Sequence, residues 1–309
     1  MRMIRLGAAC VASLALASSI LGCDLNKIAA DGAAGLLIEA SPKMEGYWDA
    51  HIAVQGMPAG IMQLEAMHYL SMGNEDLRVE LAKAYMGYAY GKVEVDFELK
   101  EAEGDLEAAD VYRARARRLY ERARNLCIGA MRLRDEGIDK AIEGGEAAVA
   151  AYVRDQYDDP DDLKTLFWTA ITWGAMVNMA ADDPDVIADM PIAKAMAERV
   201  VELDPGYGHG AALVFLGGYE CGFPEFLGGS IEKGSEIFER ALEVTGRRSH
   251  PVQLQYARLC AVNSRNRKLY VELLNEIIEA PDQGSAVRLQ NKIARHRAER
   301  YLGETDDLF

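Results

Sequence analysis

Residues 195–205, Ala-Met-Ala-Glu-Arg-Val-Val-Glu-Leu-Asp-Pro, carry the pattern that decides the fold. Apolar residues recur there at helical spacing, and a proline ends the segment, as is typical of a helix followed by a turn. The related segments are Arg118-Leu119-Tyr120-Glu121-Arg122-Ala123, Glu236-Ile237-Phe238-Glu239-Arg240-Ala241-Leu242-Glu243 and Leu273-Leu274-Asn275-Glu276-Ile277-Ile278-Glu279-Ala280-Pro281. Aligned on Ala123, Val200, Ala241 and Ile277, the four segments lie 77, 41 and 36 residues apart. The last two spacings are near one pair of helices, and the first is near two pairs.

The endings Glu202-Leu203-Asp204-Pro205 and Glu279-Ala280-Pro281 resemble the close of a tetratricopeptide repeat, in which proline ends the second helix. A single helical hairpin cannot bury its apolar stripe, whereas stacked hairpins share a core and form a curved array. The sequence therefore predicts an all-α fold, an α-solenoid of irregular tetratricopeptide-like helix pairs. The alternative is an unrelated helical bundle.

The chain divides into four expected segments. Residues 1–22 are predicted to be a signal peptide, and residues 23–57 a lipidated tether with a short first helix near 31–40. The helical repeat domain is expected over 58–303, followed by a tail over 304–309. Helix starts within the domain are marked by Asp and Pro before residue 163 and around residue 184, because Asp accepts hydrogen bonds from unpaired backbone N–H groups.

The first 23 residues indicate a secreted lipoprotein. Arg2 and Arg5 precede an uncharged apolar run, which is too short for a transmembrane helix and typical of a secretory signal. The run ends in Ile20-Leu21-Gly22-Cys23, which resembles a bacterial lipobox, where the cysteine becomes the first mature residue and carries the lipid. We expect a periplasmic protein anchored to the inner or outer membrane through Cys23. The alternatives are an ordinary cleaved signal or an uncleaved anchor.

Charge and cysteine content narrow the class of protein. The formal net charge is -15, and it becomes -17 when residues 1–22, with two arginines and no acids, are removed. Because such an acidic chain repels the phosphates of nucleic acids, no nucleic-acid partner is expected. Cys127, Cys221 and Cys260 would remain in the mature chain besides Cys23. Buried free thiols are the expectation for these three, with a Cys221–Cys260 disulfide as the alternative.

No catalytic constellation, metal site or cofactor motif is evident. The five histidines form no HExxH pattern, and no serine lies in a GxSxG elbow. The sequence therefore favours a non-enzymatic protein that needs no cofactor or metal.

Two stretches rich in aromatic residues are candidates for a binding surface. Residues 207–229 hold seven glycines and five aromatic residues, and residues 167–178 hold Trp168 and Trp173. Glycine permits close helix packing and unusual backbone angles, so tight packing is the alternative to a ligand-facing or partner-facing surface. Large aromatic residues at helical spacing likewise belong more often to the core than to a binding surface.

Several motifs, taken in order, resemble the T component of tripartite ATP-independent periplasmic (TRAP) transporters. They are Leu166-Phe167-Trp168-Thr169-Ala170 with Trp173-Gly174; Glu202-Leu203-Asp204-Pro205-Gly206-Tyr207 with Gly210-Ala211; Leu216-Gly217-Gly218-Tyr219; Pro224 with Gly228-Gly229; Phe238-Glu239-Arg240-Ala241; Tyr256-Ala257; Asn291-Lys292-Ile293-Ala294; and Arg297-Ala298. Together they cover about residues 160–302, and residues 24–159 match more loosely.

The resemblance implies a periplasmic lipoprotein that forms a homotrimer and binds the substrate-binding subunit of the transporter. It also implies an apolar cavity suited to a small hydrophobic or organic-acid ligand. A second hypothesis is a tetratricopeptide lipoprotein scaffold for envelope or pilus assembly. The positions that the resemblance carries over to the ligand or partner surface are Trp168, Trp173, Tyr207, Tyr219, Pro224, Gly228, Gly229 and Asn291.

Overall fold

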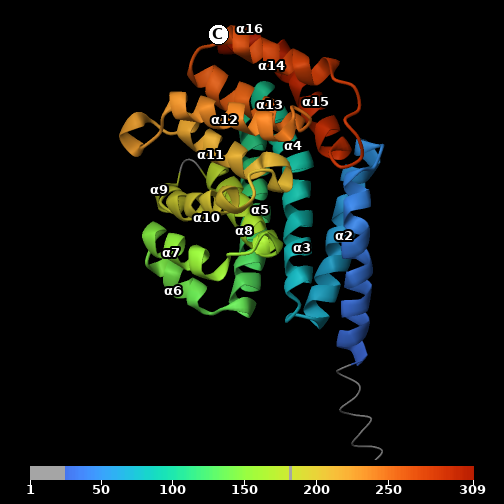
Figure 1. The fold of residues 1–309 in the computed structure, drawn as a ribbon. Helices are drawn as coiled ribbons and strands as arrows, with labels where there is room; N and C mark the ends of the chain where they lie inside the picture. Colours follow the sequence, from blue (N-terminus) through green and yellow to red (C-terminus); the bar gives the residue numbers. More distant parts are fainter. Residues whose placement is uncertain (1–24, 181–182) are drawn as a thin grey trace, which may run out of the picture.

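The computed structural model describes residues 25–180 and 183–309, and all regular elements in these ranges are helices (Figure 1). A first helix spans residues 25–45. The further helices are α2 (Ala50–Leu70), α3 (Glu75–Tyr88), α4 (Glu94–Ala102), α5 (Leu106–Arg134), α6 (Gly137–Glu143), α7 (Glu146–Gln156), α8 (Leu163–Asn178), α9 (Pro184–Ile187), α10 (Met190–Leu203), α11 (Ala211–Gly222), α12 (Ile231–Thr245), α13 (His250–Gln255), α14 (Arg267–Glu279), α15 (Arg288–Gly303) and α16 (Thr305–Leu308). The all-α prediction is confirmed for the described residues.

Short helical segments of other types lie between these helices. Two are π-helical, η1 (Ala89–Val93) between α3 and α4 and η5 (Tyr256–Ala261) after α13. Three are 3-10 turns, namely η2 (Pro160–Asp162), η3 (Tyr207–Gly210) and η4 (Glu225–Leu227).

Packing follows the order of the chain over most of the molecule. The helix α3 packs on α5, α5 on α8, α8 on α10, α10 on α11 and α11 on α12. One large apolar cluster runs from η1 to α15, and a smaller one joins α2, α3 and α5 around Leu77, Leu81 and Leu126. The exception to this order is α15, which returns to the N-terminal part of the molecule beside α2 and α4 (Figure 1).

The N-terminal segment differs from the expected tether. The helix over residues 25–45 is longer than the short helix expected near 31–40, and α2 begins at Ala50, well before Pro58. The glycines and Pro42 of this segment suggested a tether, but Gly32, Gly35 and Gly56 lie within helices with open space beside them, and Pro42 lies within the first helix. Ala30 and Ala34 are buried against neighbouring helices, and such packing outweighs low helix propensity.

The chain end and the helix starts can also be compared with the sequence. Residues 304–309, expected as a tail, contain α16, and the ring of Phe309 lies 5.3 Å from that of Tyr270 on α14. The starts predicted before α8 and α9 are confirmed. Asp162, however, forms an ion pair with Arg134 at 2.6 Å, and its side chain makes no hydrogen bond that caps α8.

The predicted signal peptide and lipobox, including Cys23, lie outside the residues that the structure describes. Within residues 25–180 and 183–309, no helix combines the length and apolar character that crossing a bilayer requires.

Candidate functional site

Trp173 is a core residue. It lies on α8 with 2% of its surface exposed, and its indole Nε1 donates a hydrogen bond to Asp189 Oδ2 at 3.2 Å. The guanidinium of Arg124 on α5 lies over the indole, 5.1 Å from the ring centre. Trp173 therefore ties α5 and α8 to the start of α10, and its side chain is not available to a partner.

The rings of Trp168 and Tyr207 both contact that of Phe167. Trp168 is half-buried and contacts both apolar clusters. The ring of Phe167 meets that of Tyr207 edge to face at 5.1 Å. Gly208 has φ +57°, and a Cβ there would collide with Phe167, so glycine is required for Tyr207 to approach α8.

Tyr219 lies in the last turn of α11, and residues 223–229 form a compact loop between α11 and α12. The rings of Tyr219 and Phe223 stack at 4.7 Å, and the Lys194 ammonium lies 5.7 Å from the Tyr219 ring centre. Gly228 adopts φ +92°, and the Gly229 N–H donates to the Pro224 carbonyl at 3.2 Å. Gly229 is buried, whereas Pro224 and Gly228 are exposed, beside a Phe226 side chain that is 84% exposed.

Asn291 is a buried connecting residue. Its Oδ1 accepts a hydrogen bond from the His250 N–H at 2.9 Å, and its Nδ2 donates to the Arg248 carbonyl at 2.8 Å. These bonds fasten α15 to the turn before α13. The predicted residues thus do not form one site: Trp173, Gly229 and Asn291 are buried, and the exposed members lie on the α11–α12 loop.

Two open depressions lie elsewhere on the surface. One, of about 640 Å³, is bordered by charged side chains of α12 such as Glu236 and Arg240, and the other, of about 710 Å³, by α14 residues such as Arg267 and Glu272. None of the predicted site residues lines either depression.

Cys221 and Cys260 form a disulfide with their Cα atoms 5.1 Å apart, so the expectation of free thiols is wrong for this pair. The helix α11 packs on η5, which brings Cys221 near the end of α11 beside Cys260 near the end of η5. Cys127 is free and buried, as expected, and burial raises the pKa of its thiol to about 12.

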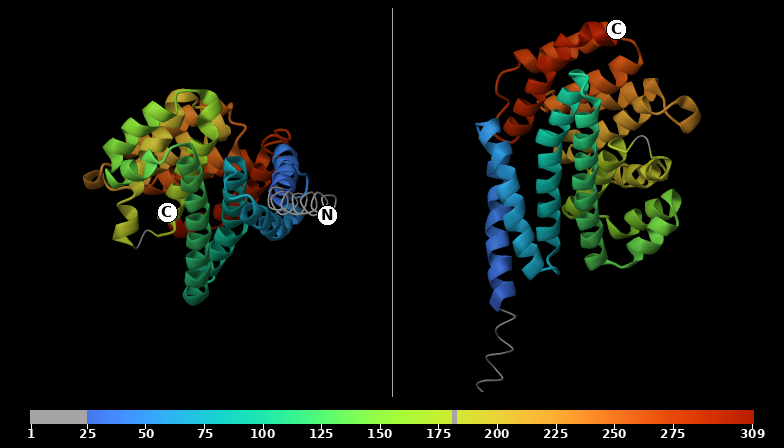
Figure 2. Two further views of the ribbon diagram at one scale, coloured as in Figure 1. Left: turned by 90° about the horizontal axis from the view of Figure 1, so that it is seen from below. Right: turned by 180° about the vertical axis from the view of Figure 1, so that it is seen from behind.

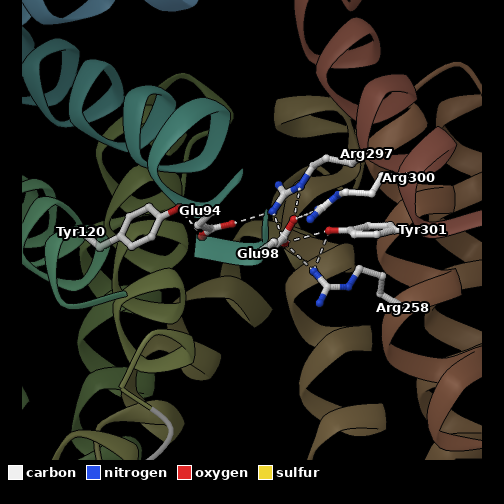
Figure 3. Close-up of polar contacts among 7 residues, drawn as sticks. All are labelled: Glu94, Glu98, Tyr120, Arg258, Arg297, Arg300 and Tyr301. Carbon is white, nitrogen blue, oxygen red and sulfur yellow. Dashed lines mark hydrogen bonds and ion pairs between the residues drawn. The ribbon is translucent and has the colours of Figure 1, made fainter. Parts of the chain in front are cut away.

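A buried cluster of charges, which we call the closure cluster, joins distant parts of the chain. It contains Tyr90, Glu94, Glu98, Tyr120, Arg258, Arg297, Arg300 and Tyr301, most of them drawn in Figure 3. The two glutamates lie on α4, and Arg297, Arg300 and Tyr301 on α15, about 200 residues later.

Glu98 is the centre of the closure cluster. Its carboxylate accepts hydrogen bonds from Arg297 Nη2 at 2.5 Å, Arg258 Nη1 at 2.7 Å and the Tyr301 hydroxyl at 2.8 Å, and it pairs with Arg300. Burial alone would raise the pKa of Glu98. The positive charges of Arg297 and Arg258 and the hydrogen bonds outweigh that effect and lower its pKa to about 2.

Glu94 and Arg297 extend the closure cluster inward. Glu94 Oε1 accepts a hydrogen bond from the Tyr120 hydroxyl at 2.5 Å, and Oε2 accepts one from Arg297 Nη2 at 3.1 Å. Burial raises the pKa of Glu94, and these two partners offset part of the increase. The Arg297 guanidinium is almost fully buried and lies 4.6 Å from the centre of the Tyr90 ring.

Both π-helical turns of the described residues contribute to the closure cluster. Tyr90 lies in η1, Glu94 follows it directly, and Arg258 lies in η5. A π-helical turn rotates the following side chains relative to a regular helix and recurs at sites where side chains must converge. Since the carboxylate oxygens are engaged by arginine and tyrosine donors, the cluster holds α15 against α4 and α5.

The sequence contained a signal for the closure cluster that was not recognised. Glu94 and Glu98 are four residues apart, as are Arg297 and Tyr301, with Arg300 between them. Like charges on one helical face repel each other, so such a pair indicates compensation from another element. The sequence gives no indication, however, that α4 and α15 are the elements that meet.

The comparisons with known proteins agree with the resemblance found in the sequence. The chain is similar to a protein of Treponema pallidum (strain Nichols) described as uncharacterized, with 24% identity over 92% of this chain and 94% of that protein. The family model of the TRAP transporter T-component matches residues 47–309. The chain therefore belongs to the TRAP transporter T-component family.

Proposed function

We propose that this protein is a lipid-anchored periplasmic accessory protein of a TRAP-type solute uptake system, and that it binds the substrate-binding subunit of the transporter. The accessory role follows from membership of a transport family rather than a catalytic one, and the family match over residues 47–309 is the observation that carries the proposal.

The N-terminal sequence supports the anchor. A cationic start, an uncharged apolar run and the Gly22-Cys23 junction agree with export followed by acylation of Cys23. The Cys221–Cys260 disulfide also suits an oxidising compartment such as the periplasm. Because the chain is strongly acidic, attraction to anionic lipid would not hold it at a membrane.

The helical body would serve as a scaffold of tetratricopeptide-like pairs, and three copies would assemble as the family resemblance implies. Sequential packing from α3 to α12 is what stacked hairpins produce. Such an array would present its loops to the substrate-binding subunit and would accept a small hydrophobic or organic-acid ligand from it.

The α11–α12 loop is the surface that we propose for the partner. Pro224 and Gly228 are exposed there beside Phe226, while Tyr219 and the hydrogen bonds around Gly229 support the loop from beneath. A preorganised loop with an exposed aromatic side chain loses little entropy on binding, and aromatic residues frequently dominate interface energies.

Capture from cells tests this function. Tagged protein purified from detergent-solubilised membranes should bring with it a periplasmic substrate-binding protein of the TRAP class. Phe226→Ser should reduce that recovery at least fivefold, whereas Leu106→Ser, a matched change of an exposed apolar residue at the start of α5, should not. Recovery of envelope-assembly or pilus-assembly proteins without any substrate-binding protein would contradict the proposal and favour the scaffold hypothesis.

A further inference from the structure

Exposed apolar side chains gather at the N-terminal end of the molecule. Among the described residues, more than half of the large apolar side chains that are exposed fall within residues 25–72. Five of them have 50–78% of their surface exposed and belong to the start of the first helix, the end of α2 and the turn after it. We call these five the apolar tip: Leu25, Ile28, Tyr69, Leu70 and Met72.

Hydrogen bonds hold the two parts of the apolar tip side by side. Asp31 Oδ1 on the first helix accepts hydrogen bonds from Ser71 Oγ at 2.5 Å and Asn74 Nδ2 at 2.7 Å in the α2–α3 turn. The Arg78 guanidinium donates two bonds to the Met72 carbonyl, at 2.7 and 2.9 Å. Figure 2 shows the beginning of the first helix and this turn at the same end of the molecule.

The apolar tip carries no net charge. Residues 66–74 contain no Asp, Glu, Lys or Arg, and Glu65 is the sole such residue in α2. In the first helix up to residue 37, the charged residues are Lys27 and Asp31, which pair with each other at 2.7 Å. An uncharged exposed face is unusual in a chain in which 27% of residues are charged.

The position of the apolar tip identifies what covers it. Only Asp24 separates Leu25 from Cys23 in the sequence, and two residues of chain span about 7 Å at most. A lipid chain on Cys23 would therefore bring the tip to the bilayer surface. Apolar side chains with a tyrosine among them suit the boundary between headgroups and acyl chains.

We infer that the apolar tip inserts into the lipid headgroup region and acts as a second membrane contact beside the anchor. The contact fixes the long helices relative to the bilayer, since no flexible tether separates the acylated residue from the first helix. This inference rests on the proposed anchoring at Cys23. The five side chains of the tip are uncharged, so the contact would rest on burial of apolar surface.

The test uses the full lipidated chain in phosphatidylcholine vesicles, with a polarity-sensitive fluorophore on a single introduced cysteine. Met72→Cys reports on the tip and Phe226→Cys is the control on the α11–α12 loop. The native thiols do not compete for the label, because Cys127 is buried with a pKa raised to about 12 and Cys221 is bonded to Cys260. Denaturant unfolding confirms that both labelled proteins are folded.

Nitroxide on the lipid acyl chains should quench the label at position 72 at least threefold more strongly than the label at position 226, and aqueous iodide should show the reverse preference. Equal access of iodide to both labels in protein whose Cys23 is acylated, as mass spectrometry shows, would overturn the inference. So would shielding of position 72 that grows with protein concentration in the absence of vesicles, which would indicate a second copy of the chain.

If mass spectrometry finds Cys23 unmodified, the proposed anchoring fails by itself. The tip is then judged by whether the unacylated protein floats with the vesicles. Flotation that is lost at least threefold in Tyr69→Ser would support the inference, and no flotation would overturn it.

Discussion

The closure cluster and the apolar tip distribute polarity in opposite ways. Glu98 and Arg297, which are charged, lie almost fully inside the protein where α4 meets α15. Tyr69 and Met72, which are large and apolar, lie largely outside at the end of the long helices. In most water-soluble proteins charged side chains lie at the surface and large apolar side chains lie inside, which is the opposite of both arrangements.

The difference indicates that the two regions have different roles, one in folding and the other in contact with something outside the chain. Buried charges are a costly way to gain stability. In any other packing of α15, however, the buried carboxylates and guanidinium groups would lose their partners, so the closure cluster favours the docking of α15 on α4. Exposed apolar surface adds nothing to folding and indicates contact with something outside the chain. Changes in the closure cluster should therefore affect stability, and changes in the apolar tip should affect location.

The largest effect is expected for Glu98→Gln. The substitution keeps the shape of the side chain and removes the buried negative charge that Arg258, Arg297 and Arg300 share. Breaking a buried pair on one side costs about 3–5 kcal/mol, because the remaining charges are left uncompensated. Urea unfolding of the two proteins measures the loss.

The matched control is Asp306→Asn, which removes an acid paired with Arg267 on the surface, where the two side chains are 86% and 57% exposed. This change should stay within about 0.5 kcal/mol of the wild type. Similar losses in the two variants would show that burial does not distinguish the closure cluster from a surface pair.

Reduction of the disulfide should have the next largest effect. The bond between Cys221 and Cys260 closes a loop of 39 residues between α11 and η5, remote from the apolar tip. A loop of this length restricts the unfolded chain, and its opening should cost about 2–4 kcal/mol. The measurement is the urea midpoint with and without dithiothreitol, and an unchanged midpoint would argue that the two thiols are free in solution.

Acid should weaken the closure cluster, which depends on an ionised Glu98. The pKa of Glu98 is lowered in the folded state to about 2, so its contribution is present above its ordinary pKa of 4.5 and is lost as the pH falls toward 2. The loss amounts to about 3 kcal/mol. The raised pKa of Glu94 acts in the opposite sense, because its contribution is present below the ordinary value and declines as the pH rises.

Two buried histidines add an earlier acid transition. Burial lowers the pKa of His68 and His250 below 6.5, so the folded state favours their neutral forms and loses stability as the pH falls below 6.5. Unfolding free energies measured from pH 7 to pH 2.5 should decline in both ranges. In Glu98→Gln the decline below pH 4.5 should be smaller by about 3 kcal/mol, and an unaltered profile would count against the assignment.

Asn291→Ala should destabilise the protein by about 1–3 kcal/mol, because it leaves the His250 N–H and the Arg248 carbonyl without their buried partner. Binding of the substrate-binding subunit should be unchanged below the unfolding midpoint. Thermal unfolding gives the first quantity and a binding titration the second. If Asn291→Ala lost binding of the substrate-binding subunit but kept the stability of the wild type, Asn291 would belong to the partner surface after all.

The smallest effect on stability is expected in the apolar tip. Tyr69 is 78% exposed, so Tyr69→Ser should alter the unfolding free energy in solution by less than about 0.5 kcal/mol. A larger loss, measured by urea unfolding of detergent-solubilised protein, would show that the tip is packed within the folded protein rather than available to a membrane.

The fold class was predictable because helical periodicity and the proline-terminated segments extend over most of the chain. The first helix was expected to be too short and α2 was expected to start too late, since the glycines and Pro42 of residues 23–57 suggested a tether, whereas the buried contacts of Ala30 and Ala34 favour the helix. Local sequence reports propensity, but it does not report which surfaces tertiary packing will cover.

The candidate site was predictable in part. Tight packing, one of the two readings of residues 207–229, holds for α11, whose glycines allow the close approach of α12, as shown by Phe238 beside Gly217. The sequence could not distinguish a buried tryptophan from an exposed one, and Trp173 lies in the core. The closure cluster was missed because it depends on two helices about 200 residues apart.

The most direct test of the accessory role is sedimentation velocity of the purified, detergent-solubilised full chain mixed with the TRAP substrate-binding subunit of the same organism. The account predicts a faster-sedimenting complex containing both proteins at micromolar concentrations, reduced by Phe226→Ser and retained in Leu106→Ser. Two independently sedimenting species at all concentrations up to 100-fold higher, with both proteins folded, would contradict it.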